Sequence, residues 1–414
     1  MFTSFSTALS ALSAHSTAVD VVGNNLANLN TTGFKASAVS FHDLVTQSLG
    51  AGLGDTQVGF GVGRPTTIRQ FTQGAIQSTN SPLDAAIQGD GFLVVRDDGD
   101  RTLYTRGGNL QVDKSGGLLT STGEAVQGWT AVNGVVNSNA PTSNILIPVG
   151  TLKAPVASKS FSFDINLNAA GVIGTPTEAF SSSIELFDSL GTSHILTVDF
   201  TKSATPNQWD YSISVPDADT TAPTAPVTGS ITFDSNGKLS SPLATDPMPS
   251  IAITGLIDGA SDMTVTWNLY DRLTPRLTQF SQASARSANT QDGNAASQLI
   301  KVALGDGGTI LAQYSNGTQT VVGQIAMASI RNPESLVSVG NNNFQLSERS
   351  SLPAVGSAGT GGRGTILGSA LESSTVDIAR EFTQLIVLQR GYQANAKVIT
   401  AVDELSQETI NLKR

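Results

Sequence analysis

Few side chains in this 414-residue sequence are combined in a way that could support catalysis or metal binding. There is no cysteine, which excludes disulfides, thiolate metal sites and a cysteine nucleophile. The three histidines, His15, His42 and His194, are far apart along the chain, and this spacing argues against a cluster of histidine ligands. Neither a Gly-x-Ser-x-Gly elbow nor a His-Glu-x-x-His pair occurs. The residue types alone therefore predict no catalytic group.

Two short segments resemble ligand-binding loops but lack their essential parts. Gly59-Phe-Gly-Val-Gly63 has neither the lysine of a phosphate loop nor the spacing of a dinucleotide fingerprint. Asp97-Asp-Gly-Asp100 lacks the alternating ligands and the terminal Glu of a calcium loop, so a solvated hairpin turn is the better interpretation. We therefore predict a protein that is not an enzyme and that has no metal site and no cofactor.

Composition and charge limit the partners of the chain. Charged residues make up 14% of it, against about 25% in typical soluble proteins. The formal net charge of −10 argues against nucleic acid and anionic membranes, because both attract basic surfaces. No apolar run is long enough to cross a membrane as a helix. The first cation is Lys35, so the N-terminus lacks the basic region of a cleaved signal peptide.

Both ends of the chain have the periodicity of long helices. Near the N-terminus, positions three and four residues apart form a mostly large and apolar seam: Phe2, Phe5, Leu9, Leu12, Ser16, Val19, Gly23 and Leu26. A helix predicted over residues 374–412 has a comparable seam, made of Leu385, Leu388, Tyr392, Ile399 and Val402. Close beside that second seam lie Ile378, Phe382, Ile386 and Ile410. This spacing predicts coiled-coil packing.

The central part of the chain, about 75–360, has short alternating segments separated by turns, which indicates antiparallel strands. Four hairpins are predicted, with strands at 92–96 and 102–106, 109–113 and 118–121, 183–187 and 194–200, and 230–233 and 238–239. The predicted fold class is α+β and mainly β. It has discontinuous N- and C-terminal coiled-coil helices, and two β domains nested by insertion.

The N-terminal helix should need partners on more than one side. Residues 1–34 carry one charged side chain, Asp20, so nothing ionic would keep the opposite face in solution. One possibility is that the terminal helices pair only with each other. The alternative is that they also pack against further copies of the chain, which is favoured by the small residues Ala8, Ala11, Ala14 and Ala18 on a second face.

Two stretches resemble signatures at the two ends of bacterial flagellar rod, hook and hook-associated proteins. The first runs over 18–35 and has the core Asn-Asn-x-Ala-Asn-x-Asn-Thr-x-Gly-Phe-Lys, and the second runs over 381–397. The N-terminal signature residues are Asn24, Asn25, Ala27, Asn28, Asn30, Thr31, Gly33, Phe34 and Lys35. Those of the C-terminal signature are Gln389, Arg390, Gly391, Tyr392, Gln393, Ala394 and Asn395. Segments 83–92 and 104–109 are also similar to this family.

The residue chemistry explains part of the N-terminal signature. Asn24, Asn25, Asn28 and Asn30 could cap a helix, adopt left-handed backbone conformations or bind exposed backbone groups. Gly33 would allow a tight bend that buries the ring of Phe34.

The resemblance implies an order of domains. Residues 1–34 and 375–414 would form a helical core lining an inner tube, and 35–74 and 357–374 would be connecting hinges, with glycine clusters at 50–63 and 356–368. A middle β domain would consist of 75–147 and 291–356. The outer inserted β domain, 148–290, carries thirteen acidic and seven basic residues, a net charge of −6, which suits a surface facing water.

The resemblance also implies a function. The insertion and its Leu186–Val198 stretch are similar to the outer domain of hook-type members, which form a flexible curved tube between rod and filament. The assembly core would consist of Phe2, Phe5, Leu9, Leu12, Val19, Leu26, Phe382, Leu385, Leu388, Tyr392, Ile399 and Val402. Implied partners are copies of the chain, the distal rod protein, the hook cap, the hook-filament junction protein and the flagellar type III export apparatus. The alternatives are a distal rod-type member, or a secreted β-rich adhesin or polysaccharide-active enzyme with helical oligomerisation ends.

Overall fold

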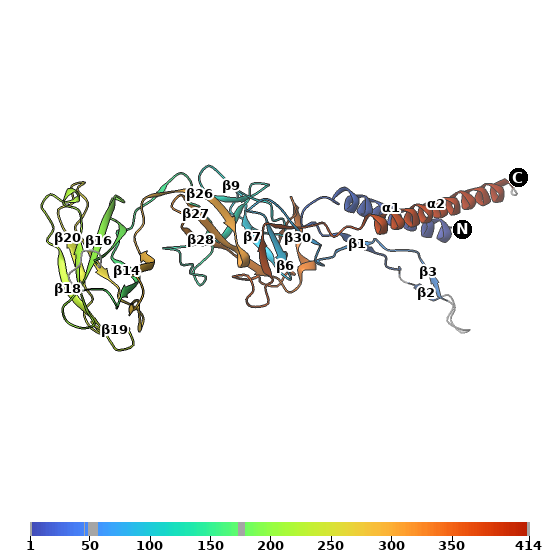
Figure 1. Cartoon of the computed structure of the whole chain (residues 1–414). Helices are drawn as coiled ribbons and strands as arrows, with labels where there is room; N and C mark the ends of the chain where they lie inside the picture. The colour runs from blue at the N-terminus through green and yellow to red at the C-terminus, as the bar shows by residue number, and fades with distance from the viewer. Residues whose placement is uncertain (1, 45, 49–56, 173–178, 412–414) are drawn as a thin grey trace. The chain divides into compact units, whose positions relative to one another are not determined.

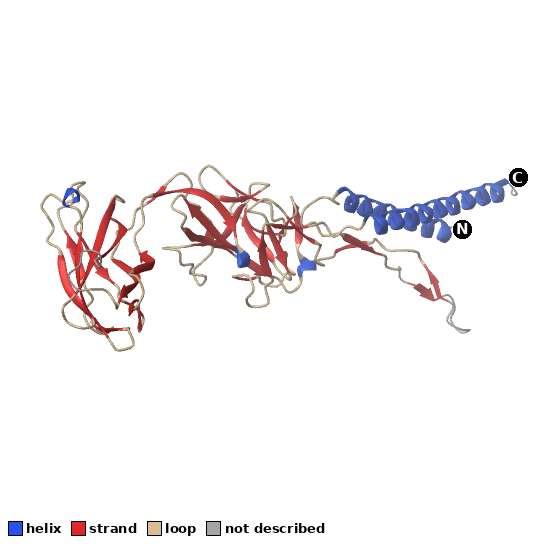
Figure 2. Cartoon of the chain, viewed as in Figure 1, coloured by secondary structure: helices blue, strands red, loops and turns tan. Residues whose placement is uncertain are grey.

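The computed structural model describes residues 2–44, 46–48, 57–172 and 179–411. Helix α1 (Phe2–Ala27) and helix α2 (Ile378–Asn411) lie at the two ends of the chain, and strands make up most of the regular structure between them (Figures 1 and 2). The chain divides into two compact units. The first unit consists of Met1–Val149, Lys301–Gln313 and Gln319–Arg414, and the second of Gly150–Ile300 and Tyr314–Thr318.

The first unit is built on a sheet in which the central strands follow the order β27-β28-β11-β7-β8-β31-β30. These seven strands are β7 (Phe92–Arg96), β8 (Thr102–Thr105), β11 (Ala125–Thr130), β27 (Thr309–Tyr314), β28 (Gln319–Ile325), β30 (Val337–Gly340) and β31 (Asn343–Gln345). Three strands from the N-terminal half of the sequence therefore lie between two pairs of strands from the C-terminal half. Strands that pair beside this path are β9 (Leu110–Val112), β10 (Leu118–Thr120), β12 (Ser143–Asn144), β29 (Met327–Ser329) and β32 (Ala354–Gly356).

Four short two-stranded ladders lie, along the sequence, between this sheet and the helices. They pair β1 (Ser37–Ser40) with β4 (Thr66–Arg69), and β2 (Thr46–Ser48) with β3 (Gln57–Gly59). Two further ladders pair β5 (Ile76–Ser78) with β34 (Ala370–Glu372), and β6 (Ala85–Gln88) with β33 (Thr365–Gly368). The first half of the first glycine cluster, 50–63, lies outside the described residues, which resume at position 57. The second cluster, 356–368, includes β33, whose Ile366 is fully buried, so this part of the predicted hinge is a paired strand.

The aromatic centre of the first unit comes from three separate segments. Phe71, Phe92 and Phe344 meet edge to face, with ring centroids 5.4 to 6.0 Å apart. Val94 and Tyr104, from the β7–β8 hairpin, are buried in the same cluster. This aromatic contact joins residues from both halves of the sequence.

The second unit consists of two five-stranded sheets around one core. One sheet has the order β20-β21-β14-β24, with β25 also paired to β14, and the other has the order β15-β16-β17-β18-β19. Their bounds are β14 (Ser160–Asn168), β15 (Phe180–Phe187), β16 (Ser193–Lys202), β17 (Gln208–Ser214), β18 (Val227–Phe233), β19 (Leu239–Ser241), β20 (Ser250–Ile253), β21 (Met263–Trp267), β24 (Leu277–Phe280) and β25 (Ala285–Gln291). The other elements, which belong to one unit or the other, are β13 (Leu152–Lys153), β22 (Tyr270–Asp271), β23 (Thr274–Pro275), β26 (Ser297–Leu304), η2 (Asp217–Asp219), η3 (Asp306–Gly308) and η4 (Pro333–Ser335).

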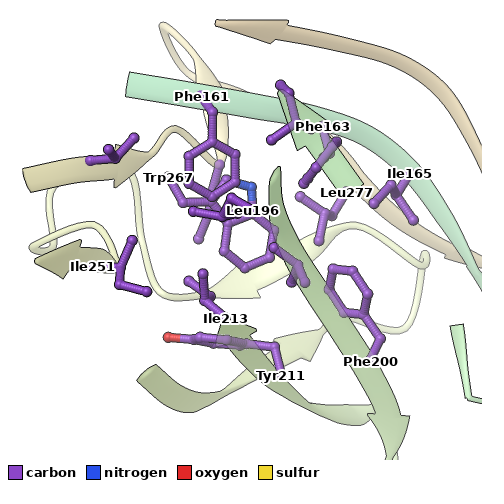
Figure 3. Packing of buried hydrophobic residues seen from close by; sticks show 14 of the residues in the cluster. Phe161, Phe163, Ile165, Leu196, Phe200, Tyr211, Ile213, Ile251, Trp267 and Leu277 are labelled. Carbon is purple, nitrogen blue, oxygen red and sulfur yellow. The ribbon is translucent and has the colours of Figure 1, made fainter. Parts of the chain in front are cut away.

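The core of the second unit follows from alternation along its strands. On β16 every second side chain from His194 to Phe200 is buried, while those between are exposed or half-buried. Trp267 lies at the centre, stacked on Phe161 and meeting Phe200 and Tyr211 edge to face (Figure 3). Two inner sheet faces that each supply alternate apolar residues form one continuous core.

The predicted hairpins are confirmed by the strand pairing. Val95 pairs with Leu103, Leu119 with Gln111, Glu185 with Ile195, and Phe233 with Leu239. The Asp97–Asp100 segment is the expected hairpin turn, because the Asp97 carboxylate accepts the N–H groups of Gly99 and Arg101. Among the described residues, neither helix has the length and apolar character needed to cross a membrane.

Candidate assembly site

The two terminal helices lie side by side (Figure 2). They pack together through small side chains on α1. Ala18 and Val22 are buried in a cluster with Leu388 of α2. Ala8 and Ala14 of α1 are also buried. A small side chain lets two helix backbones come close, so the alanine-rich face of α1 is the one turned inward within a single chain.

The large apolar seam of α1 is only partly turned away from α2, because Val19 and Leu26 pack against the buried cluster whereas its first described residues are exposed. Phe5 is 41% exposed and Leu9 is 53% exposed. On α2, Phe382, Ile386 and Tyr392 are also exposed. Leu12, Val19, Leu26, Leu385, Ile399 and Val402 are half-buried, and Leu388 is buried. The predicted core residues are therefore divided between the helix pair and its outer surface, and the side chain of Phe2 lies outside the described part.

Gly391 of the C-terminal signature is explained by a close contact with α1. A Cβ atom at this position would lie 2.7 Å from Cε1 of His15. The His15 ring also packs against Phe41, with ring centroids 5.6 Å apart. A glycine within a helix costs about 1 kcal/mol relative to alanine, and here it makes room for an imidazole between the helices.

Asn25 connects α1 to β1 and to α2. Its Nδ2 donates to the Ser37 carbonyl oxygen at 2.8 Å and to Glu381 Oε1 at 3.3 Å, while its Oδ1 accepts the Ser37 N–H at 3.0 Å. Asn25 is 1% exposed. A carboxamide offers both a donor and an acceptor to one backbone unit, which explains why an asparagine occupies this position.

Of the three roles considered for the asparagines, bonding to backbone groups is the one that Asn25 and Asn28 show, and the left-handed conformation does not occur. Asn24, Asn25, Asn28 and Asn30 all have negative φ. Asn28 instead donates to the Asn24 carbonyl oxygen at 2.9 Å, which satisfies an acceptor in the last turn of α1. The left-handed residue is Gly33, with φ +66°, and it buries the ring of Phe34 beside Ala36 and Val376 as expected.

A buried ion triad follows this bend. Lys35 Nζ lies 2.6 Å from Glu372 Oε1, and Arg106 Nη1 lies 3.2 Å from Glu372 Oε2. The side chains of Lys35 and Glu372 are 0% exposed, and that of Arg106 is 3% exposed. Burial, followed by the nearby Arg106 guanidinium, lowers the pKa of Lys35 below its ordinary value, while Glu372 opposes this shift. The triad joins the N-terminal segment, the β8 hairpin and the C-terminal segment.

Backbone groups satisfy the remaining polar atoms of the triad. Lys35 donates to the Thr72 carbonyl oxygen, and Arg106 donates to the carbonyl oxygens of Gly89 and Gly91. The Gly74 N–H donates to Glu372. Sequence reasoning missed two members. Arg106 lay in a stretch similar to the family, but Glu372 carried no signal that could have identified it.

The other signature residues are less constrained by the chain itself. Thr31 donates to Asn28 Oδ1, and Asn395 donates to the Gly391 carbonyl oxygen. Exposed signature residues are Asn24, Ala27, Asn30, Gln389, Arg390, Tyr392, Gln393 and Ala394. Contacts within a single chain therefore explain only part of each signature.

Replacing Gly33 by Ala should destabilise the first unit by at least about 2 kcal/mol. A Cβ atom at Gly33 would lie 2.5 Å from the Arg106 carbonyl oxygen, and the backbone there has φ +66°. The left-handed conformation alone costs about 1–2 kcal/mol for a residue with a side chain, and the collision adds to it. Urea unfolding followed by circular dichroism would measure the loss.

Gly307 provides the matched control for this substitution. It also belongs to the first unit and has φ +73°, but nothing lies within 4 Å of an added Cβ atom. Gly307→Ala should therefore show only the conformational cost. Equal destabilisation by both substitutions would contradict the importance of the contact with Arg106.

Comparisons with known families assign the chain to the axial structural proteins of the bacterial flagellum. The flagella basal body rod protein family matches residues 5–35, and the C-terminal family of flagellar basal body rod FlgEFG proteins matches 367–412. The flagellar hook protein FlgE/F/G D1 domain matches 86–173. The flagellar basal body protein FlaE D2 domain matches 170–294.

Relatives that match over the full length narrow this class to one family. The chain is 32% identical to flagellar hook protein FlgE of Treponema pallidum, over 100% of both chains. It is 33% identical to flagellar hook protein FlgE of Escherichia coli, over 99% of this chain and 100% of that protein. The chain therefore belongs to the flagellar hook protein family, and it is a structural subunit of the flagellar hook.

The fold has a counterpart among solved structures. The crystal structure of Helicobacter pylori flagellar hook protein FlgE2 superimposes with a TM-score of 0.53 and 15% sequence identity, covering 70% of this chain and 99% of that one. At this identity the likeness concerns the fold alone.

Proposed function

We propose that the chain polymerises through its terminal helices, which line the inner tube of a hook. The observation that supports this proposal is the exposed apolar surface on both helices, represented by Phe5 and Leu9 on α1 and by Phe382 and Ile386 on α2. Burying a large apolar side chain contributes about 1.5–3 kcal/mol, so several such contacts per subunit would drive assembly. The helices would then form a coiled-coil core that continues from copy to copy.

The proposed order of domains assigns a separate role to each β region. Residues 75–147 and 291–356 would form the middle domain, and the acidic segment 148–290 would be the outer inserted domain facing water. Segments 35–74 and 357–374 would connect them to the helical core. Weakly charged contact surfaces rich in Ser, Thr and Gly suit a tube that bends as it rotates, because their contacts exchange at lower cost than desolvated ion pairs.

Specific partners and the export route are part of the same proposal. Family membership supports contacts with the distal rod protein below, the junction protein above and the hook cap during growth. It also supports export through the flagellar type III apparatus without a cleaved signal peptide. The role proposed for the chain is structural and not enzymatic. A distal rod role and an adhesin role are less favoured, because the full-length relatives are named hook proteins.

The proposal is tested by removing both helices from the chain. A fragment of residues 28–377 retains Phe34, Val376 and the ion triad, which support the fold of the first unit. We expect the full chain to form tubes in electron micrographs and the fragment to remain monomeric in light scattering, with its β-sheet circular dichroism unchanged. Tubes formed by the fragment would contradict assembly through the helices.

A further inference from the structure

Three ligand-type side chains meet at one end of the second unit. Asp188 lies in the turn between β15 and β16, His194 lies on β16, and Asp258 lies in the segment between β20 and β21. One potential ligand atom from each lies within 4.8 Å of the other two. His194 is isolated among the histidines of the sequence, and the fold supplies the carboxylates around it.

His194 lies between two carboxylates and is almost completely buried. Its Nε2 lies 3.0 Å from Asp188 Oδ2, and its Nδ1 lies 3.1 Å from Asp219 Oδ2. The residue is 4% exposed. A metal-binding histidine commonly has one ring nitrogen on the ion and the other facing a carboxylate. Asp219 is placed to orient the ring in this way.

Backbone groups hold both ligand carboxylates in place. Asp188 Oδ1 accepts the N–H groups of Leu190 and Thr192, at 2.8 and 2.9 Å, which leaves Oδ2 facing His194. Asp258 Oδ1 accepts the Ala260 N–H at 3.0 Å. Asp188 is fully buried, whereas Asp258 is exposed, so an ion could enter from the solvent side.

The loops that carry these residues are also bonded to each other. The Ile257 N–H donates to the Asp219 carbonyl oxygen at 3.1 Å, and the Ser261 N–H donates to Ser189 Oγ at 3.0 Å. The Thr221 N–H donates to the Gly255 carbonyl oxygen at 2.8 Å. The ligand geometry is therefore supported by contacts that do not depend on an ion.

We propose that Asp188, His194 and Asp258 bind a divalent transition metal ion, with Zn²⁺ the best match, and that Asp219 orients His194. One imidazole and two carboxylates suit Zn²⁺ better than Ca²⁺ or Mg²⁺, which prefer oxygen ligands. Ligand atoms about 2.0–2.1 Å from a tetrahedral ion are roughly 3.3 Å apart, close to the spacing of His194 and Asp188. Water would complete the coordination, and the bound ion would connect the two ligand-bearing loops to β16.

Charge balance favours a cation at this position. Asp188, Asp219 and Asp258 together carry three negative charges when ionised, and a protonated His194 offsets only one. A divalent ion bound between these side chains supplies two positive charges.

Zinc titration of the full-length, chelator-treated protein tests the site. Calorimetry should show one Zn²⁺ bound per chain, with Ca²⁺ and Mg²⁺ at least 100-fold weaker. His194→Gln and Asp258→Asn should each weaken Zn²⁺ binding at least 100-fold, and Asp219→Asn should weaken it about 10–100-fold. His15→Gln and His42→Gln are matched controls on the other histidines and should leave the affinity unchanged.

Two results would overturn the site. One is wild-type Zn²⁺ affinity in the Asp258→Asn variant, whose exposed side chain can change without disturbing the core and whose amide oxygen can still accept the Ala260 N–H. The other is the absence of wild-type binding at micromolar Zn²⁺, which would leave His194 as the ion-pair partner of Asp188 and Asp219. Circular dichroism of each variant separates lost binding from lost folding, so an unfolded His194→Gln protein leaves Asp258→Asn as the decisive test.

Discussion

Replacing Glu372 by Gln should lower the free energy of unfolding of the first unit by about 3–5 kcal/mol. Lys35 and Arg106 would then remain buried without the carboxylate that neutralises them, and breaking a buried ion pair from one side has an effect of this size. Glutamine keeps the shape of the side chain, so lost packing contributes little. Because typical domains are stable by only about 5–15 kcal/mol, this change should be visible in every measure of folding.

Hydrogen exchange in moderate urea can assign this loss to one unit. Peptides that cover β7 and β8 should exchange faster in Glu372→Gln than in the wild type, while peptides that cover β15 to β18 should be unchanged. The matched control is Asp100→Asn, which removes the Arg96–Asp100 pair in the same unit. Asp100 is 82% exposed along its side chain and has φ +61°, which asparagine tolerates.

The control variant should change stability by less than about 1 kcal/mol, because exposed ion pairs contribute little. The prediction fails if Glu372→Gln is as stable as Asp100→Asn. In that case the triad would not hold the terminal segments to the sheet, and their positions would depend on the Phe34 cluster and the β5–β34 ladder alone.

Replacing Leu9 by Asp should abolish polymerisation while leaving the single chain folded. Leu9 is 53% exposed on the outer face of α1, so a carboxylate there remains hydrated in the monomer. In the proposed tube the same carboxylate would be desolvated without a partner, at a cost of several kcal/mol. A loss of about 3 kcal/mol per contact raises the concentration needed for assembly more than about 100-fold. Sedimentation and electron microscopy measure this change directly.

Two further variants separate assembly from folding. Leu9→Met keeps an apolar side chain of similar volume and should still assemble. Leu388→Asp should block assembly by another route, because Leu388 is buried against Ala18 and Val22 within the chain. Its helical circular dichroism should therefore fall in the monomer, whereas that of Leu9→Asp should not. Normal tubes from Leu9→Asp would exclude this face of α1 as a subunit contact.

Local patterns predicted the elements of the structure well. Alternation and turn residues identified the β7–β8 and β15–β16 hairpins, and helical spacing identified α1 and α2 close to their ends. The bend at Gly33 was also predictable, because a glycine before an aromatic ring is a local signal. Each of these features depends on the conformational preferences of residues that are close together in the sequence.

The choice of contact face on α1 could not be predicted in the same way. Both the large seam through Leu9 and the small face through Ala18 have helical spacing. The structure turns the small face toward α2, because alanine lets the helices approach closely. Sequence periodicity therefore established that α1 has two faces for packing, while the packing of the folded chain showed which face is used within the chain.

By itself, the sequence determined the terminal helices, the β-rich centre, the absence of cysteine chemistry and the flagellar signatures. Only the tertiary structure revealed the contact of Lys35 with Glu372, which are separated by 337 positions, and the meeting of Asp188, His194 and Asp258. The physical reason is that secondary structure and turns depend on short-range preferences. A buried charge instead needs whichever partner the completed fold brings to it, and no local pattern specifies that partner.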